Sequence, residues 1–364
     1  MKQTALNANH VRRKVKMAEF QGWSLPVQFT DLEDEHHAVR AAAGLFDAGF
    51  LGRLELSGPG AIALLQSLFT RKVDDLADGT VLYGLFCDDE GFIIDNALIM
   101  KKPSGKNGPR FLITTNPGAA SAVQAWISGK KGSDAVLSDR TAEIAQLALQ
   151  GPAADQVLEK LAGTHLKKLK EKKARELTLA GAQVLVSRTG YTGERGYELF
   201  VPAVSVEALW EAILEAGKNL GVLPCGMMTR EILRMEAGFA QQGNEIDKTR
   251  TPVETALLAV VDLSKDQFVG KAAIEKRKAA GAEEALVGFE LLDKGIPKLG
   301  GTIFSENREI GTVTSGSHSY HRRRDIGLGY VKKRYDQPGQ EVEIEVKDRE
   351  VAAKIVHLPF YHRK

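Results

Sequence analysis

Apolar and polar positions follow two different rhythms along this chain, and the change of rhythm divides it. In the first two thirds, apolar residues that recur every three to four positions predict amphipathic helices. These segments are residues 32–43, 58–69, 118–127, 153–163, 204–221 and 227–238. Apolar runs typical of strands lie between them, at residues 80–100, 110–116, 145–152, 180–187 and 196–202. Helices and strands therefore mix without the regular βαβ order of a parallel sheet.

The last third has a different pattern. It begins after residues 275–284, a stretch rich in charge and alanine that we interpret as a linker. Short strands follow at close intervals, at residues 285–292, 300–304, 309–317, 325–331, 341–346 and 350–356. This spacing predicts a small antiparallel barrel or sandwich from about residue 280 to the end.

Composition and charge narrow the class of protein. The chain has 364 residues, so two or three domains are expected. A net charge of +2 does not indicate a nucleic-acid binder, which usually has a strongly basic face. The basic run at residues 165–176 is interpreted as a solvated helix face or loop. Cys87 and Cys225 form no CxxC motif, which favours a reduced, cytoplasmic compartment. No apolar stretch is long enough for a membrane helix, and no residue cluster has metal-ligand spacing.

Residues 187–198, SRTGYTGERGYE, form the most distinctive stretch. Their GxxGxxG spacing differs from the GxGxxG of dinucleotide-binding loops, and a strand follows where those loops open a helix. Glycines also let the backbone approach a ligand closely. Glu194 could then bind the planar, amidine-like edge of a pterin or guanine through two parallel hydrogen bonds. The other interpretation is a plain hairpin with one exposed acid.

This stretch resembles the signature of the aminomethyltransferase (T-protein) family of the glycine cleavage system. Further motifs occur in family order, namely FQGWSLPVQF, EHHAVRAAAGLFDAG, LELSGPGA, ALQGP, LRMEAG, GNEI, FVGKAAI and GTVTSG. The resemblance covers nearly the whole chain and implies an α+β fold of three domains around a folate channel, with a C-terminal antiparallel β-barrel. The expected division is a folate-binding region at 1–279, with interleaved lobes at about 1–52 with 140–240 and 53–139 with 241–279, and a barrel at 280–364.

The resemblance also implies an activity. Members of the family take an aminomethyl group from lipoylated H-protein, release ammonia and pass the carbon to tetrahydrofolate. In GFIIDN, residues 91–96, Asp95 matches the first Asp of the family's GG-[IV]-[IL]-DD motif and is the expected catalytic acid. Loss of ammonia requires a protonated amine, and a carboxylate can relay that proton and stabilise the iminium charge. The residues alone favour an acid bonded to backbone at a turn or strand end, and the resemblance to the family favours the catalytic role.

Six further residues are expected to bind folate because they match the family pattern. Glu194 matches the glutamate that hydrogen-bonds the pterin ring. The others are Tyr83, Asn116, Tyr191, Arg230 and Arg363. The two arginines suit the glutamate tail of folate at the channel mouth, since a guanidinium binds carboxylates as a planar fork.

The chain departs from the family pattern near these residues. Phe50 and Phe92 add apolar bulk, and Asn96 stands where the family has a second Asp. The alternative function is therefore a paralogous tetrahydrofolate-dependent demethylase that acts on a small methylated amine or sulfonium compound. A folate-binding protein of iron–sulfur maintenance is a second alternative, although its reactive-cysteine motif is missing. The basic turn at 321–324 could dock an acidic partner such as H-protein or be a solvated loop.

Overall fold

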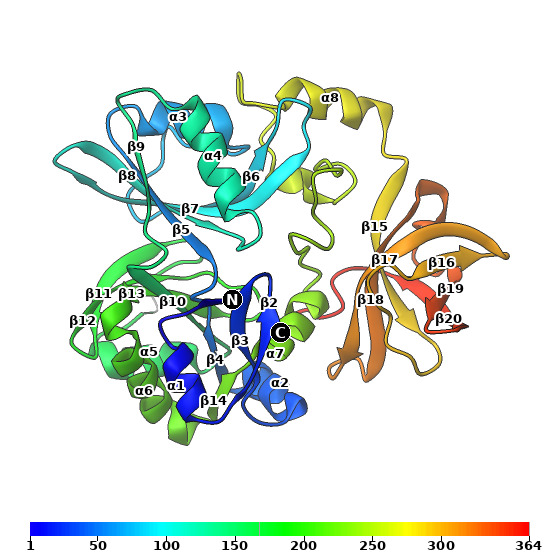
Figure 1. Ribbon diagram of the computed structural model, residues 1–364, viewed down its shortest axis with the longest axis horizontal. Helices are drawn as coiled ribbons and strands as arrows, with labels where there is room; N and C mark the ends of the chain where they lie inside the picture. The colour runs from blue at the N-terminus through cyan, green and yellow to red at the C-terminus, as the bar shows by residue number, and fades with distance from the viewer. Residues whose placement is uncertain (167, 364) are drawn as a thin grey trace.

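The computed structural model describes residues 1–166 and 168–363 of the chain. Figure 1 shows three bodies around a common centre: a lobe with a five-stranded sheet, a lobe with a six-stranded sheet, and a separate closed barrel. Both ends of the chain lie near this centre. The C-terminal segment therefore returns from the barrel to the two lobes.

The six-stranded sheet has the order β11-β12-β13-β10-β4-β14, and only β4 and β14 are parallel neighbours. Its strands are β4 (Ala43–Asp47), β10 (Ile144–Gln150), β11 (Ala174–Leu179), β12 (Ala182–Ser187), β13 (Gly196–Pro202) and β14 (Val222–Cys225). Helices α5 (Ala154–Ala162) and α6 (Val206–Gly217) pack against it. Their apolar positions recur at helical spacing, so Leu209, Trp210 and Ile213 are all fully buried in one core.

The five-stranded sheet has the order β6-β7-β8-β5-β9 and is antiparallel throughout. Its strands are β5 (Gly52–Ser57), β6 (Val81–Cys87), β7 (Ile93–Gly105), β8 (Gly108–Thr115) and β9 (Val136–Asp139). Helices α3 (Ala61–Leu68) and α4 (Ala120–Lys130) contribute to the core of this lobe. Because β5 follows β4 directly and β10 follows β9, the chain crosses between the lobes at both of these points. The division into interleaved lobes with the bounds given above remains a prediction.

Several shorter elements complete the two lobes and their connections. They are β1 (Lys2–Gln3), α1 (Asn7–Arg12), β2 (Lys16–Phe20), β3 (Trp23–Gln28), α2 (Leu32–Ala41), α7 (Met227–Glu236) and α8 (Lys271–Ala280). Single turns of 3-10 helix lie at Ala203–Ser205, Lys218–Leu220, Leu257–Val260 and Lys333–Tyr335. Helix α7 contacts α2, β3 and the barrel strand β17, so it sits at the junction of the lobes and the barrel.

The C-terminal domain is the predicted barrel. Six antiparallel strands close in the order β15-β18-β17-β16-β19-β20. They are β15 (Glu284–Leu291), β16 (Thr302–Ser305), β17 (Arg308–Ser319), β18 (Arg324–Lys332), β19 (Glu341–Val346) and β20 (Arg349–Val356). Alternate residues such as Val342, Ile344 and Val346 point into one buried core. The structure therefore confirms the α+β class with a C-terminal antiparallel barrel.

The structure differs from the sequence-based expectation in two segments, residues 275–284 and 165–176. The stretch at 275–284, interpreted as a linker, begins inside helix α8 and ends at the first residue of β15. Helix α8 buries only Ile274, so its apolar spacing is too weak to reveal it. The basic run at 165–176 contains no helix among its described residues, and residue 167 lies outside them. Leu166 and Leu169 from this run are buried in the core of the six-stranded lobe.

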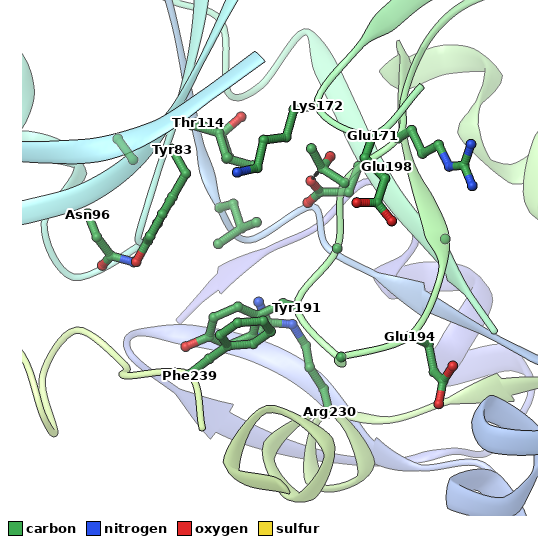
Figure 2. Close-up of a pocket in the computed structure, with 18 of the residues that line it drawn as sticks. Tyr83, Asn96, Thr114, Glu171, Lys172, Tyr191, Glu194, Glu198, Arg230 and Phe239 are labelled. Carbon is green, nitrogen blue, oxygen red and sulfur yellow. Dashed lines mark hydrogen bonds between the residues drawn. The ribbon is translucent and has the colours of Figure 1, made fainter. Parts of the chain in front are cut away.

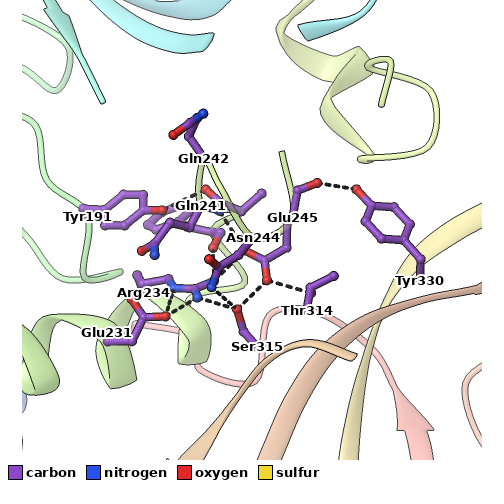
Figure 3. A network of polar contacts seen from close by, with 12 residues as sticks. Tyr191, Glu231, Arg234, Gln241, Gln242, Asn244, Glu245, Thr314, Ser315 and Tyr330 are labelled. Carbon is purple, nitrogen blue, oxygen red and sulfur yellow. Dashed lines mark hydrogen bonds and ion pairs between the residues drawn. The ribbon is translucent and has the colours of Figure 1, made fainter. Parts of the chain in front are cut away.

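A buried ion pair joins α7 to the barrel. Arg234 and Glu245 have fully buried side chains, and Nη1 and Oε2 are 2.9 Å apart. Glu245 also accepts hydrogen bonds from Thr314 at 2.7 Å and Ser315 at 2.5 Å, both on β17 (Figure 3). Arg234 donates to the same Ser315 hydroxyl at 2.6 Å. Helix α7, the loop after it and strand β17 thus share one polar network.

We expect Glu245→Ala to lower the free energy of unfolding by roughly 3 kcal/mol, because it leaves the Arg234 charge buried with fewer partners. Glu231 still pairs with Arg234, which keeps the loss at the lower end of the usual range. Urea unfolding measures the change. Glu309→Ala, the same substitution at an exposed position of β17, is the control. Equal losses in the two variants would contradict a stabilising role for the network.

Candidate active site

A cavity of about 540 Å³ lies between the two lobes. Strands β6, β7 and β8 contribute Tyr83, Asn96 and Thr114 to its wall. The opposite wall consists of residues 188–196 and strand β13, and α7 contributes Arg230 (Figure 2). Residues from segments that are far apart in the sequence line this one cavity. We therefore take it as the candidate active site.

The loop between β12 and β13 approaches the cavity closely because its glycines permit it. A Cβ added to Gly190 would lie 1.9 Å from the side-chain oxygen of Gln150. Gly193 has a φ of +80°, which side chains disfavour, and a Cβ there would lie 3.0 Å from Ala237. The glycine spacing of this segment is therefore required by close packing, and the segment presents Tyr191 and Glu194 to the site.

Glu194 has a cationic partner. Its Oε1 lies 3.0 Å from Nη1 of Arg40, and the same guanidinium donates to Glu236 at 2.6 Å. The guanidinium also lies 3.7 Å from the ring centroid of Tyr361. Figure 2 shows the Glu194 carboxylate turned away from the aromatic side chains of the cavity. Glu194 borders the cavity, but its carboxylate is already paired with Arg40.

Glu198 is a site residue that sequence reasoning missed. It lies on β13, is 7% exposed and borders the cavity, into which it projects in Figure 2. Its carboxylate accepts hydrogen bonds from Gln146 at 2.8 Å and Thr189 at 2.5 Å. Burial raises the pKa of this carboxyl, although both hydrogen bonds oppose the shift. An acid inside the apolar strand GYELFV was the signal that could have identified it.

An aromatic and cationic stack forms another part of the wall. The rings of Tyr191 and Phe239 are nearly parallel, at 17°, with centroids 5.4 Å apart. The guanidinium of Arg230 lies 4.4 Å from the Tyr191 centroid. Burial lowers the pKa of Arg230, and no carboxylate among the described residues forms an ion pair with it. Arg230 therefore lies inside the cavity wall and not at the mouth, where the sequence analysis had placed it.

The exposed end of the cavity is polar. Arg363 lies there and pairs with Glu171 at 2.9 Å, and both side chains are substantially exposed. Lys172 and Arg188 border the same end of the cavity. The position of Arg363 is thus compatible with the expected mouth, and two further cations accompany it.

Asp95 lies behind the cavity wall. It is fully buried and does not border the cavity, whereas its neighbour Asn96 does. The two side chains alternate across β7, as successive residues of a strand must. Asp95 accepts hydrogen bonds from the backbone and side-chain nitrogens of Asn116, at 2.9 and 2.8 Å. Burial raises its pKa to about 7, and these hydrogen bonds limit the shift. The expected acid is present, but amides separate it from the ligand space.

The two phenylalanines that depart from the family pattern do not line the cavity. Phe50 is 1% exposed, packs edge-on against Phe20 and lies 5.4 Å from the Arg230 guanidinium. Phe92 lies in the hairpin between β6 and β7, where its backbone nitrogen donates to Asp88. Of the three departures, only Asn96 changes the wall itself.

Comparison with known proteins agrees with this architecture and site. Residues 6–265 match the GCVT N-terminal domain, and residues 285–362 match the glycine cleavage T-protein C-terminal barrel domain. The chain therefore belongs to the glycine cleavage T-protein family.

Full-length relatives carry the name aminomethyltransferase. A protein from a Geobacillus species is 42% identical over 100% of this chain and 99% of its own length. One from Halothermothrix orenii is 40% identical over 99% and 100% of the two chains. The crystal structure of glycine cleavage system aminomethyltransferase T from Bartonella henselae matches with a TM-score of 0.92 and 28% identity over 100% of this chain and 99% of its own.

Two other features of the described residues bear on the site. No helix among residues 1–166 and 168–363 is long and apolar enough to cross a membrane. Over the same residues, no group of three or more His, Cys, Asp or Glu side chains is arranged to hold a metal ion.

The buried acid predicts how stability depends on pH. The pKa of Asp95 is raised from 3.8 to about 7, so its ionised form destabilises the fold. This cost is absent below about pH 4, where folded and unfolded chains are both protonated, and it is complete above about pH 7. Between these limits the free energy of unfolding should fall by up to roughly 4 kcal/mol through this group.

Urea unfolding of the wild type and Asp95→Asn over pH 4 to 8 measures the effect. The stability of the variant relative to wild type should increase as the pH rises. Parallel profiles of the two proteins would contradict the raised pKa.

Proposed function

We propose that this chain is the tetrahydrofolate-dependent aminomethyltransferase of a glycine cleavage system, which takes its carbon from the lipoyl arm of H-protein and releases ammonia. The observation that carries the proposal is the full-length match to aminomethyltransferases together with a cavity whose polar groups suit a reduced pterin. The cytoplasmic location expected from the cysteines is part of the same proposal.

Glu198 is the better candidate for the pterin anchor. A carboxylate can accept two parallel hydrogen bonds from an amidine-like edge, and such charge-assisted pairs are strong in a buried site. Glu198 faces the cavity, whereas Glu194 is held by Arg40. The stack of Tyr191, Phe239 and Arg230 offers a flat surface beside it for a planar ring. Glu194 then has the role of holding the loop.

The remaining expected residues have roles that follow from their positions. Tyr83 and Asn116 border the cavity near Asp95, whose ionised carboxylate places negative charge behind the wall. Negative charge at a fixed position stabilises a developing iminium cation. Arg363, Lys172 and Arg188 suit the carboxylates of a folate tail at the exposed end.

The basic turn at 321–324 is only partly available to a partner. Arg322 pairs with Glu290 at 2.6 Å, and the ring of His321 packs edge-on against Tyr361. Arg323 and Arg324 are exposed without such partners among the described residues. These two arginines are the part of the turn that could contact an acidic H-protein.

The demethylase alternative now rests on Asn96 alone. Asn96 places an amide in the cavity wall where the family pattern has an acid, whereas Phe50 and Phe92 do not border the cavity. The iron–sulfur alternative has no such support. Cys87 and Cys225 are buried, and burial raises the pKa of both thiols above the usual range.

The activity is tested with tetrahydrofolate and aminomethyl-loaded H-protein by measuring ammonia and methylenetetrahydrofolate. We expect turnover that depends on H-protein, with kcat lower by about 10²-fold in Asp95→Asn through loss of the fixed charge. Asp89→Asn, the same change at an exposed residue before β7, should keep the wild-type rate. Tetrahydrofolate binding without any ammonia release would instead favour the demethylase, and methylated amines would be tried next.

The pterin anchor is tested with a matched pair of variants. Glu198→Gln should weaken tetrahydrofolate binding by about tenfold to a hundredfold, since it removes a charge-assisted hydrogen bond worth roughly 1.5–3 kcal/mol. Glu194→Gln should have a smaller effect, because its carboxylate binds Arg40. Titration calorimetry measures both affinities. The reverse order would restore Glu194 as the anchor.

A further inference from the structure

A chain of hydrogen bonds runs from the buried Asp95 to the cavity wall. Asn116 Nδ2 lies 2.8 Å from Asp95 Oδ1 and 2.8 Å from Asn96 Oδ1. Asn96 Nδ2 in turn lies 3.0 Å from the Tyr83 hydroxyl (Figure 2 shows the last contact). Four side chains from the neighbouring strands β6 and β7 and from the loop after β8 are therefore connected in series.

The carboxylate at one end gives this chain a direction. Above about pH 7, where Asp95 is ionised, its carboxylate only accepts hydrogen bonds, so Asn116 must turn its NH2 group towards it. The second hydrogen of that group meets Asn96, whose side-chain and backbone oxygens lie 2.8 and 3.1 Å from Asn116 Nδ2, so the Asn96 amide also turns its oxygen towards this donor. The nitrogen of Asn96 consequently faces Tyr83 and donates to it. If either amide were reversed, two oxygens or two NH2 groups would face each other in a buried site.

The direction decides what the wall offers to a ligand. Tyr83 accepts from Asn96, so its own hydroxyl hydrogen remains to be donated, and none of the described residues accepts it. Burial raises the pKa of Tyr83 to about 12, so the phenol keeps this hydrogen. Asn116 Oδ1 likewise receives no hydrogen bond from a described residue. Both residues border the cavity.

We infer that Asp95 is a positioning residue, which acts through Asn116 and Asn96 to make Tyr83 a hydrogen-bond donor and Asn116 Oδ1 an acceptor at the cavity wall. This arrangement suits a ligand with nitrogen groups: Asn116 accepts from an N–H, and Tyr83 donates to a nitrogen lone pair. The inference deepens the proposed function and rests on it for the identity of the ligand. The direction of the chain itself does not depend on which ligand binds.

The direction is tested first in the ligand-free protein. Asparagine side chains are labelled with ¹⁵N, and the NH2 resonances of Asn96 and Asn116 are assigned by substituting each in turn. Asp95→Asn should shift both pairs of resonances, including that of Asn96, which does not hydrogen-bond Asp95 through its side chain. Asp89→Asn is the matched control and should shift neither. An unmoved Asn96 resonance in Asp95→Asn would overturn the inference.

The effect on the ligand is tested with a double-mutant cycle. Asp95→Asn should weaken tetrahydrofolate binding by about tenfold in the wild type, roughly 1.4 kcal/mol. In Tyr83→Phe, which lacks the end of the chain, the same change should have clearly less effect. Asn96→Ala removes the middle of the hydrogen-bond chain, so Asp95→Asn should also have less effect in that background. If Asp95→Asn misfolds, Asn96→Ala still tests the chain, because it should weaken tetrahydrofolate binding as Tyr83→Phe does. Equal penalties in both backgrounds would overturn the inference.

The two tests separate the inference from the proposed function. Resonance shifts without tetrahydrofolate binding by any form of the protein would support the hydrogen-bond chain and contradict the proposed ligand. Tetrahydrofolate-dependent turnover with an unmoved Asn96 resonance would support the enzyme and contradict the chain.

Discussion

The position of helix α7 is the constraint on which the rest of the structure depends, and the buried ion pair between Arg234 and Glu245 sets it. The pair is completely removed from water, so its charges are stabilised by each other, by Glu231 and by the hydroxyls of the barrel strand β17. Arg230 lies one helical turn before Arg234 and forms the cavity wall with Tyr191. A shift of the helix against the barrel would therefore also move the cation of the cavity.

A second set of contacts holds the last residue of α7, at the same end of the helix. Glu236 accepts hydrogen bonds from His36 at 2.8 Å, Arg40 at 2.6 Å and Ser319 at 2.6 Å. Although burial opposes it, these cationic neighbours lower the pKa of Glu236 to about 2. Arg40 also holds Glu194 in the glycine loop. The loop, helix α2, helix α7 and the barrel are thus fixed together, which makes the cavity wall rigid on that side.

The sequence predicted the class of fold, the barrel and the family, because these depend on apolar periodicity and on motifs that are local in the chain. It did not predict which acids face the cavity. Glu194 and Glu198 lie four positions apart in one motif, and the residue that neutralises Glu194 is Arg40, 154 positions away. Strand alternation separates Asp95 from Asn96, but the packing of the two lobes decides which face borders the cavity.

Asn96 stands where the family pattern has an acid, so the cavity wall lacks a titratable group at this position. The buried carboxyl of Asp95 does not replace it. Asp95 supplies charge, and the amides in front of it convert that charge into oriented donors and acceptors in a site of low dielectric. An amide does not titrate, however, so the wall between Asp95 and the ligand space cannot itself give up or take a proton. Orientation of the ligand and supply of the proton are therefore separate tasks in this cavity. Any proton that leaves with an amine has to come from the ligand, from solvent or from Glu198, which is the remaining buried acid that faces the cavity among the described residues.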